Sequence, residues 1–253
     1  MPLIVHQFPC LSDNYGFLAH DEATGKTACI DTPEAAPILA ALKARGWTLD
    51  FILNTHWHPD HAGGNAEIVA ATGATVVGPA EVTKLAPIDR EVNGGDVVML
   101  GETKFEVIET GGHTLGHIAY FDAEDGIAFV GDTLFALGCG RLFEGTAEQM
   151  WTSLQRLVAL PGDTTVYCAH EYTASNARFA LSVDDDPALK ARAAEIFAMR
   201  ERGEPTVPTT IALEKATNPF LRAPQLAERV GAGGEPDYKA FGAVRAAKDN
   251  FKG

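Results

Sequence analysis

The feature that most constrains the fold is a change of sequence pattern near residue 170. Before it, short runs rich in β-branched and aromatic residues alternate with Ala- and Leu-rich runs. This alternation predicts layered sheets flanked by helices. After it, residues 173–203 have a helical pattern, and several prolines and the Gly-rich run 231–236 precede a short basic helix at 241–251. We therefore expect an α/β part over residues 1–172 and a small helical part over 173–253.

The first part can be divided into elements because turn-forming Pro, Asn, Gly or Asp residues end most of the runs. The three expected helices cover residues 33–45, 65–72 and 147–160. The expected strands cover residues 3–8, 15–21, 27–31, 50–55, 74–78, 96–100, 104–110, 117–122, 126–132 and 164–170.

Composition excludes several classes of function. The chain has 253 residues, of which 46% are hydrophobic, which is enough for a buried core. Lys and Arg number 20 against 34 Asp and Glu, and the formal charge of −14 would repel nucleic acids and anionic membranes. No run approaches the roughly 18 apolar residues of a membrane span, and the N-terminus has no basic signal-peptide region. We expect a cytoplasmic monomer with no nucleic-acid or membrane partner.

The four cysteines have no short spacing between them. They stand at positions 10, 29, 139 and 168. Without a CxxC pair, such cysteines are more typical of buried thiols than of disulfides or a zinc knot.

A dense cluster of possible metal ligands follows the apolar strand expected at 50–55. Three histidines and one aspartate occur within six residues, as His56, His58, Asp60 and His61. Neutral imidazole and carboxylate groups are good ligands for zinc, iron or manganese. An irregular loop can converge such side chains, whereas a helix would spread them. The alternative is a polar surface turn, which we consider much less frequent for this pattern.

Further histidines and an aspartate stand at the ends of expected strands. His113 lies between two strands, Asp132 follows the run GIAFVG, and His170 ends the run TTVYCAH. Strand ends are common places for sites in layered α/β proteins. Singly, Asp132 could cap a helix and His170 could stabilise a turn, but together they indicate a site. His6, His20 and His117 are interpreted as structural residues.

The motifs together resemble known families. THWHPDH at 55–61, GHTLGH at 112–117, Asp132 and His170 resemble the metallo-β-lactamase superfamily. Four further segments resemble glyoxalase II, the hydroxyacylglutathione hydrolase family, over nearly the whole chain: CGRLFEGT at 139–146, HEYT at 170–173, ATNPF at 216–220 and RAAKD at 245–249.

This resemblance implies a fold and a metal centre. The fold would be α/β, a metallo-β-lactamase-like αββα sandwich with a small C-terminal helical domain. Residues 1–172 would be the metal-binding catalytic domain and residues 173–253 the helical glutathione-binding domain. Two divalent metal ions are implied, with zinc expected first and iron or manganese as alternatives. One ion would be held by His56, His58 and His113, the other by Asp60, His61 and His170, with Asp132 as the bridge and with Asp60 and Asp132 as catalytic residues.

The resemblance also implies where the glutathione part of a substrate binds. The implied residues are Arg141, Phe143, Tyr172, Arg245 and Lys248. Two of them depart from the family pattern, because Arg141 and Phe143 stand where Lys and Tyr are expected. Arginine keeps the positive charge but changes the hydrogen-bond geometry, and phenylalanine lacks the tyrosine hydroxyl.

The implied reaction is hydrolysis of S-(2-hydroxyacyl)glutathione, typically S-D-lactoylglutathione, to glutathione and D-lactate in methylglyoxal detoxification. A hydroxide held by the metals would attack the thioester carbonyl. The thiolate leaves readily, because an ordinary thiol has a pKa of about 8.5.

Three alternatives stay open. A mononuclear-iron glutathione persulfide dioxygenase is disfavoured by the terminal RAAKD segment, and a metallo-nuclease by the acidic charge. A non-catalytic metal- or glutathione-binding protein is disfavoured by the intact ligand set.

Overall fold

The computed structural model describes residues 2–253, which divide into two compact units. Unit 1 holds the chain up to Glu109 together with Gly116–Gly131. Unit 2 holds Thr110–Leu115 and Asp132–Gly253. The short segment 110–115 is therefore separated from the rest of unit 2 by the sixteen residues that return to unit 1.

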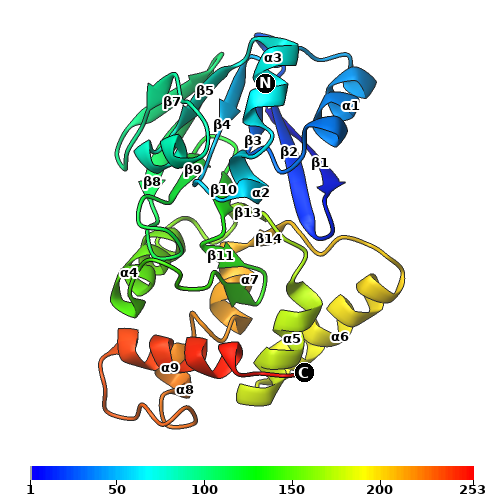
Figure 1. Cartoon of the computed structure of the whole chain (residues 1–253). Helices are drawn as coiled ribbons and strands as arrows, with labels where there is room; N and C mark the ends of the chain where they lie inside the picture. Colours follow the sequence, from blue (N-terminus) through cyan, green and yellow to red (C-terminus); the bar gives the residue numbers. More distant parts are fainter. Residues whose placement is uncertain (1) are drawn as a thin grey trace. The chain divides into compact units, whose positions relative to one another are not determined.

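The first sheet of unit 1 has six strands in sequence order. β1, β2 and β3 are antiparallel, and β3 to β6 are parallel. Helices α1 (Ala35–Arg45) and α3 (Asn65–Thr72) connect parallel strands and lie beside this sheet (Figure 1). The strands are β1 (Leu3–Cys10), β2 (Asn14–Asp21), β3 (Lys26–Ile30), β4 (Phe51–Leu53), β5 (Thr75–Gly78) and β6 (Arg90–Glu91).

Both crossover helices end where the sequence predicts. α1 ends at Gly46 and α3 at Gly73, and both glycines adopt the left-handed conformation that ends a helix at low cost. Ile38 of α1 and Ile68 of α3 pack with apolar residues of the sheet to form one core. The short 3₁₀ helix η1 (Ala80–Lys84) follows β5.

Unit 1 also contains an antiparallel meander in the spatial order β10-β9-β8-β7. It packs on the first sheet: the ring centroid of Phe17 in β2 lies 5.8 Å from that of Phe129 in β10. The Tyr120 hydroxyl donates a hydrogen bond of 2.9 Å to the carbonyl of Asn54. The four strands are β7 (Val97–Leu100), β8 (Thr103–Glu109), β9 (Ile118–Asp122) and β10 (Ile127–Gly131).

Unit 2 is mainly helical, as the sequence pattern after residue 170 predicts. Two pairs of strands are antiparallel: β11 (Leu134–Phe135) with β12 (Gly138–Cys139), and β13 (Thr165–Cys168) with β14 (Thr209–Thr210). The helices are α4 (Ala147–Val158), α5 (Thr173–Val183), α6 (Pro187–Glu201), α7 (Ile211–Thr217), α8 (Ala223–Leu226) and α9 (Asp237–Asp249).

The helical stretch expected at 173–203 is in fact two helices, α5 and α6. The break has a local cause, because Pro187 cannot continue the hydrogen bonding of α5 and opens α6 instead. Asp186 caps the new helix by accepting a hydrogen bond of 2.8 Å from the backbone N–H of Ala188. The two-residue strand β14 was not predicted, because so short a run has no readable alternation.

Two further expectations can be compared with the structure. All four cysteines are buried free thiols, which confirms the interpretation of their spacing. Within residues 2–253, no helix is long and apolar enough to cross a membrane.

Candidate metal centre and substrate pocket

The histidine-rich loop of unit 1 follows strand β4 directly. Helix α2 (Pro59–Ala62) is a single turn that brings His61 back toward His56. Their ring centroids lie 4.0 Å apart, and His56 Nε2 lies 3.0 Å from His58 Nδ1. The irregular turn thus gathers imidazoles that a long helix would distribute around its axis.

Two carboxylates face His61 from opposite sides of its ring. Asp60 Oδ2 lies 3.5 Å from His61 Nε2 and accepts a hydrogen bond of 3.1 Å from Asn14 Nδ2. Asp31 Oδ2 lies 2.8 Å from His61 Nδ1. Ligand atoms of Asp31, His56 and His61 all lie within 4.8 Å of one another. Unit 1 therefore brings together the four residues that the motif predicts, and adds a fifth.

Asp31 is the functional candidate that the sequence analysis missed. It directly follows β3, is buried, and accepts hydrogen bonds of 2.7 Å from both the backbone N–H and the hydroxyl of Thr55. The signal that could have identified it was present, because an aspartate at the end of an apolar strand is the feature that singled out Asp132.

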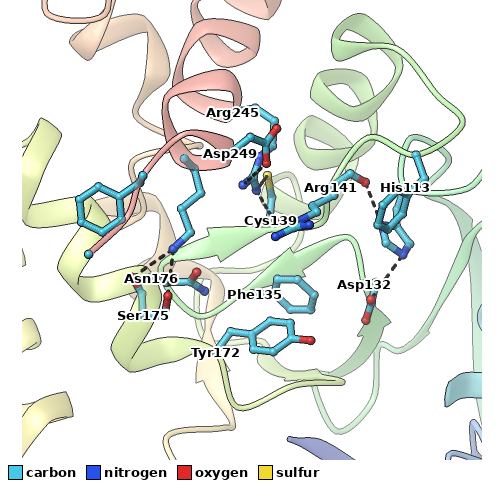
Figure 2. Close-up of a pocket in the computed structure, with 14 residues that line it drawn as sticks. His113, Asp132, Phe135, Cys139, Arg141, Tyr172, Ser175, Asn176, Arg245 and Asp249 are labelled. Carbon is cyan, nitrogen blue, oxygen red and sulfur yellow. Dashed lines mark hydrogen bonds and ion pairs between the residues drawn. The ribbon is translucent and has the colours of Figure 1, made fainter.

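Unit 2 contains the remaining three predicted ligands, each at the end of a different segment. His113 Nε2 lies 3.4 Å from Asp132 Oδ2, and His170 Nε2 lies 3.3 Å from Asp132 Oδ1. All three side chains are buried, and Figure 2 shows His113 beside Asp132. The backbone at position 140 passes so close to Asp132 that only glycine fits there, because a Cβ atom would lie 2.0 Å from the Asp132 carbonyl oxygen. Asp132 caps none of the helices of residues 2–253, so the alternative role considered for it is absent.

The hydrogen bonds of two histidines orient them as metal ligands. His113 Nδ1 lies 2.8 Å from the Arg141 carbonyl oxygen, which can only accept, so we assign the proton to Nδ1. The Nε2 lone pair of the neutral ring then faces the Asp132 carboxylate. His61 is placed in the same way between its two carboxylates. Lone pair and carboxylate repel unless a cation lies between them, and separations of 3.3–3.5 Å exceed those of a charge-assisted hydrogen bond.

This donor set, imidazole and carboxylate with a second hydrogen bond fixing the far side of the ring, is that of a divalent-metal centre. The residues present therefore fit a metal ion in both units.

A cavity of about 510 Å³ lies within unit 2, next to these ligands. Figure 2 shows His113 and Asp132 on one side of it and Ser175 and Asn176 on the other. The five residues predicted to bind substrate all line this cavity: Arg141, Phe143, Tyr172, Arg245 and Lys248.

Aromatic rings surround the metal-ligand side of the cavity. Phe143 packs edge-on against His113 with centroids 5.2 Å apart, and it is 61% exposed. Tyr172 stacks parallel on His170 at 4.6 Å. Phe135 stands edge-on to both Tyr172 and His170. The reacting part of a bound molecule would therefore have apolar neighbours.

Arg245 is buried in the wall of the cavity. Its Nη1 donates a hydrogen bond of 2.9 Å to the carbonyl of Cys139, and its Nη2 lies 2.9 Å from Asp249 Oδ1. The guanidinium also lies 4.9 Å from the ring centroid of Phe220. Its Nε, which is buried, has no hydrogen-bond partner among residues 2–253. The two hydrogen bonds and the ring contact fix the guanidinium in the cavity wall.

Lys248 is half-buried and donates hydrogen bonds of 3.1 Å to the carbonyl and the hydroxyl of Ser175. Burial, followed by the positive charges of Arg245, Arg178 and Arg141, lowers the pKa of Lys248 to about 8. Three cations, Arg141, Arg245 and Lys248, therefore line one cavity in a chain whose net charge is −14.

The other histidines and the thiol of the cavity have different surroundings. His117 is buried and stacks on His56 with centroids 4.7 Å apart, and His20 stacks on Trp47 at 4.2 Å. His6 lies in β1 beside Arg45. Burial raises the pKa of the Cys139 thiol to about 11, although Arg245 partly opposes this.

Comparison with known proteins is consistent with this geometry. The family model described as metallo-beta-lactamase superfamily matches residues 24–170, and the model described as hydroxyacylglutathione hydrolase C-terminus matches residues 171–251. A protein of Erythrobacter litoralis (strain HTCC2594) named hydroxyacylglutathione hydrolase is 59% identical over 98% of this chain and 100% of its own length.

Solved structures show the same fold. ETHE1 from Myxococcus xanthus superposes with a TM-score of 0.68 at 29% identity, over 97% of this chain and 98% of its own. TTHA1623, solved in a di-iron-bound form, gives a TM-score of 0.63 at 26% identity, over 86% of this chain and 100% of its own. The expected fold, metallo-β-lactamase-like with a C-terminal helical part, is confirmed.

Proposed function

The chain belongs to the hydroxyacylglutathione hydrolase family of the metallo-β-lactamase superfamily, and we propose from this that it hydrolyses S-(2-hydroxyacyl)glutathione, typically S-D-lactoylglutathione. The products are glutathione and a 2-hydroxy acid. One observation carries the proposal: two of the proposed metal ligands, His113 and Asp132, line the same cavity of unit 2 as a cluster of cations. A thioester of an anionic peptide needs metal ions near its carbonyl group for hydrolysis and cations near its peptide part for binding.

The metal centre of the proposal contains two divalent ions, zinc first and iron or manganese as alternatives. His56, His58 and His113 would hold one ion, Asp60, His61 and His170 the other, and Asp132 would bridge them. The di-iron form of TTHA1623 supports two ions on this fold. When bound, such ions lower the pKa of water and polarise a carbonyl oxygen.

The protein's own contribution begins with orientation. The Arg141 carbonyl holds the proton of His113 on Nδ1, and Asp31 does the same for His61. Each ring can therefore present its Nε2 lone pair to a cation. Asp132 faces two imidazoles with its two oxygens, which suits it to bridge and to fix the position of the nucleophile.

The distal part of the substrate is proposed to meet the cations of the cavity. Glutathione thioesters are anionic, and the whole chain would repel them weakly at long range. At short range the positive charges of Arg245, Lys248 and the exposed Arg141, which all line the cavity, attract the anionic substrate. Since these groups lie away from the reacting carbonyl, they act mainly on binding.

The leaving group requires little help from the protein. A glutathione thiolate has an ordinary thiol pKa of about 8.5, so it can depart without a general acid. Cys139 does not act as a nucleophile, because burial raises its pKa to about 11 and keeps the thiol protonated. The reaction is therefore a direct hydrolysis, without an acyl-enzyme.

A glutathione persulfide dioxygenase is the second candidate, because it would use the same cavity for glutathione. The match of residues 171–251 to the hydroxyacylglutathione hydrolase C-terminus favours the hydrolase. The proposed domain boundary near residue 172 lies beside the end of the first family match at 170. The monomeric state and the cytoplasmic location stay predictions.

The test combines metal analysis and turnover on one sample. We expect two equivalents of metal per chain and hydrolysis of S-D-lactoylglutathione far faster than that of a β-lactam. An oxygen electrode with glutathione persulfide serves as the control reaction. Oxygen consumption with a single equivalent of iron, or metal binding without any turnover, would overturn the proposal.

A further inference from the structure

The floor of the cavity in unit 2 is a very short hairpin formed by β11 and β12. Phe135 and Cys139, one on each strand, line the cavity. The turn between them contains Leu137, whose φ of 56° lies in the left-handed region. A leucine adopts this conformation only at a cost, so surrounding groups must hold it.

One buried carboxylate lies behind this turn. Glu214 of α7 is fully buried, and its Oε2 accepts a hydrogen bond of 2.9 Å from the backbone N–H of Leu137. The neighbouring Asn218 side chain donates to the Phe135 carbonyl at 3.1 Å and to the Gly138 carbonyl at 2.9 Å. Two side chains of one helix segment therefore bind three backbone groups of the hairpin.

The other oxygen of Glu214 is fixed as well. Oε1 accepts a hydrogen bond of 2.6 Å from the Thr209 hydroxyl and forms an ion pair with Arg192, which is buried. Asn218 also donates to Oε2 at 3.0 Å. With all these partners in place the carboxylate cannot rotate, so it sets the position of the Leu137 N–H rather than following it.

The hairpin in turn holds two residues that line the cavity. Its Ala136 carbonyl accepts a hydrogen bond of 3.1 Å from Asn176 Nδ2, and its Cys139 carbonyl accepts one of 2.9 Å from Arg245 Nη1. Figure 2 shows Arg245 above the hairpin residue Cys139 and Asn176 below it, and both residues line the cavity. A shift of the hairpin would displace both residues at once.

We infer that Glu214 is a positioning residue for substrate binding, although it does not itself line the cavity. Assisted by Asn218, it fixes the left-handed turn at Leu137 and through the hairpin sets the spacing of Asn176 and Arg245. This inference rests on the proposed function, because the bound molecule is taken to be a glutathione thioester. None of these hydrogen bonds goes to a proposed metal ligand, so the larger effect is expected on binding and the smaller one on the chemical step.

The main test replaces the carboxylate by an amide in the full-length, metal-loaded protein. Glu214→Gln should raise the KM for S-D-lactoylglutathione about 10-fold, with kcat within about 3-fold of the original and full metal content. Calorimetric titration with glutathione should show the same loss of affinity. Asn218→Ala, which removes the donors to the two hairpin carbonyls and the hydrogen bond to Glu214, should also raise KM.

Asp184→Asn is the matched control, because Asp184 is a buried carboxylate of unit 2 whose partners, Arg222 and the backbone N–H of Asp186, lie outside the hairpin. It should lower the melting temperature and leave KM unchanged. An equal KM increase in this control, unchanged KM in both Glu214→Gln and Asn218→Ala, or loss of folding in both would overturn the inference. Absence of both turnover and glutathione binding in the unsubstituted protein would instead contradict the proposed function.

Discussion

The two units supply their proposed metal ligands in different ways. In unit 1 the four residues lie within six positions of one loop, between His56 and His61. In unit 2 His113, Asp132 and His170 lie on separate segments that span 58 positions, and the cavity also needs residues of α9. The first set is gathered by one local turn, whereas the second is gathered only when the whole unit has folded.

This difference determines how each set is kept in place. The loop of unit 1 is held by neighbours in the same sheet, chiefly Asp31 and Thr55 at the ends of β3 and β4. In unit 2 the position of Asp132 depends on Gly140, and that of His113 on the Arg141 carbonyl. We therefore expect unit 2 to be the more sensitive to distant substitutions.

The largest effect is expected from replacing Asp132, which stands apart from the other proposed ligands in the sequence and faces the imidazoles of His113 and His170. Asp132→Ala should lower kcat by at least about 10²-fold and reduce the bound metal, because a bridging carboxylate stabilises both ions. Steady-state kinetics and elemental analysis on the same preparation measure both effects. Asp163→Ala, an exposed aspartate of unit 2, is the control. Full metal content with near-normal kcat in the Asp132 variant would remove this residue from the site.

The corresponding test in unit 1 concerns Asp31, which contacts the metal-ligand loop only through His61 and Thr55. Asp31→Asn should weaken metal affinity about 10- to 100-fold, the usual effect of removing a carboxylate behind a metal-binding histidine. Competition with a chromogenic chelator measures the affinity directly. Asp50→Asn, another partly buried aspartate of unit 1, should leave it unchanged. Equal affinity in the Asp31 variant would show that the loop holds its own geometry.

The sequence alone predicts most of the fold, since the expected strands and helices nearly all appear within a few residues of their predicted bounds. α3 matches residues 65–72 without any shift. The sequence also identifies the loop at 56–61 as a cluster of possible metal ligands, because close spacing along the chain is visible in a sequence. The roles of Asp31 and Glu214 are not visible, because each depends on a partner brought close by tertiary folding. Similarly, the buried contacts of Arg245 with Cys139 join residues 106 positions apart.

A smaller effect, a change of KM with pH, is expected from the cations of the cavity in unit 2 and not from either set of proposed metal ligands. Burial and three nearby arginines lower the pKa of Lys248 to about 8, so the side chain is a cation below this pH and neutral above it. The KM for an anionic thioester should therefore rise as the pH increases through 8, by about 10-fold if one charge-assisted hydrogen bond of about 1.5 kcal/mol is lost. Measurements of KM between about pH 6.5 and 9.5 test this.

Lys248→Arg is the informative variant for the same comparison, because a guanidinium keeps its charge throughout that pH range. Its KM should stay flat where that of the unsubstituted protein rises. An identical pH profile in both proteins would contradict a role of Lys248 in binding and would assign the titration to another group.

The smallest effect is expected at Phe143, where this chain departs from the tyrosine of the family pattern. The ring is 61% exposed and packs edge-on against His113, so a hydroxyl at its tip would be added without a desolvation cost. One new neutral hydrogen bond to substrate contributes about 0.5–1.5 kcal/mol, which corresponds to a decrease in KM of about 2- to 10-fold for Phe143→Tyr. The melting temperature should not change, because the position is on the surface. Phe143→Leu, which lacks both the ring and the hydroxyl, distinguishes the two contributions. If KM is the same for Tyr and Phe at this position, the residue faces solvent and not the substrate. The aromatic residues that contact the substrate would then include Tyr172 but not residue 143.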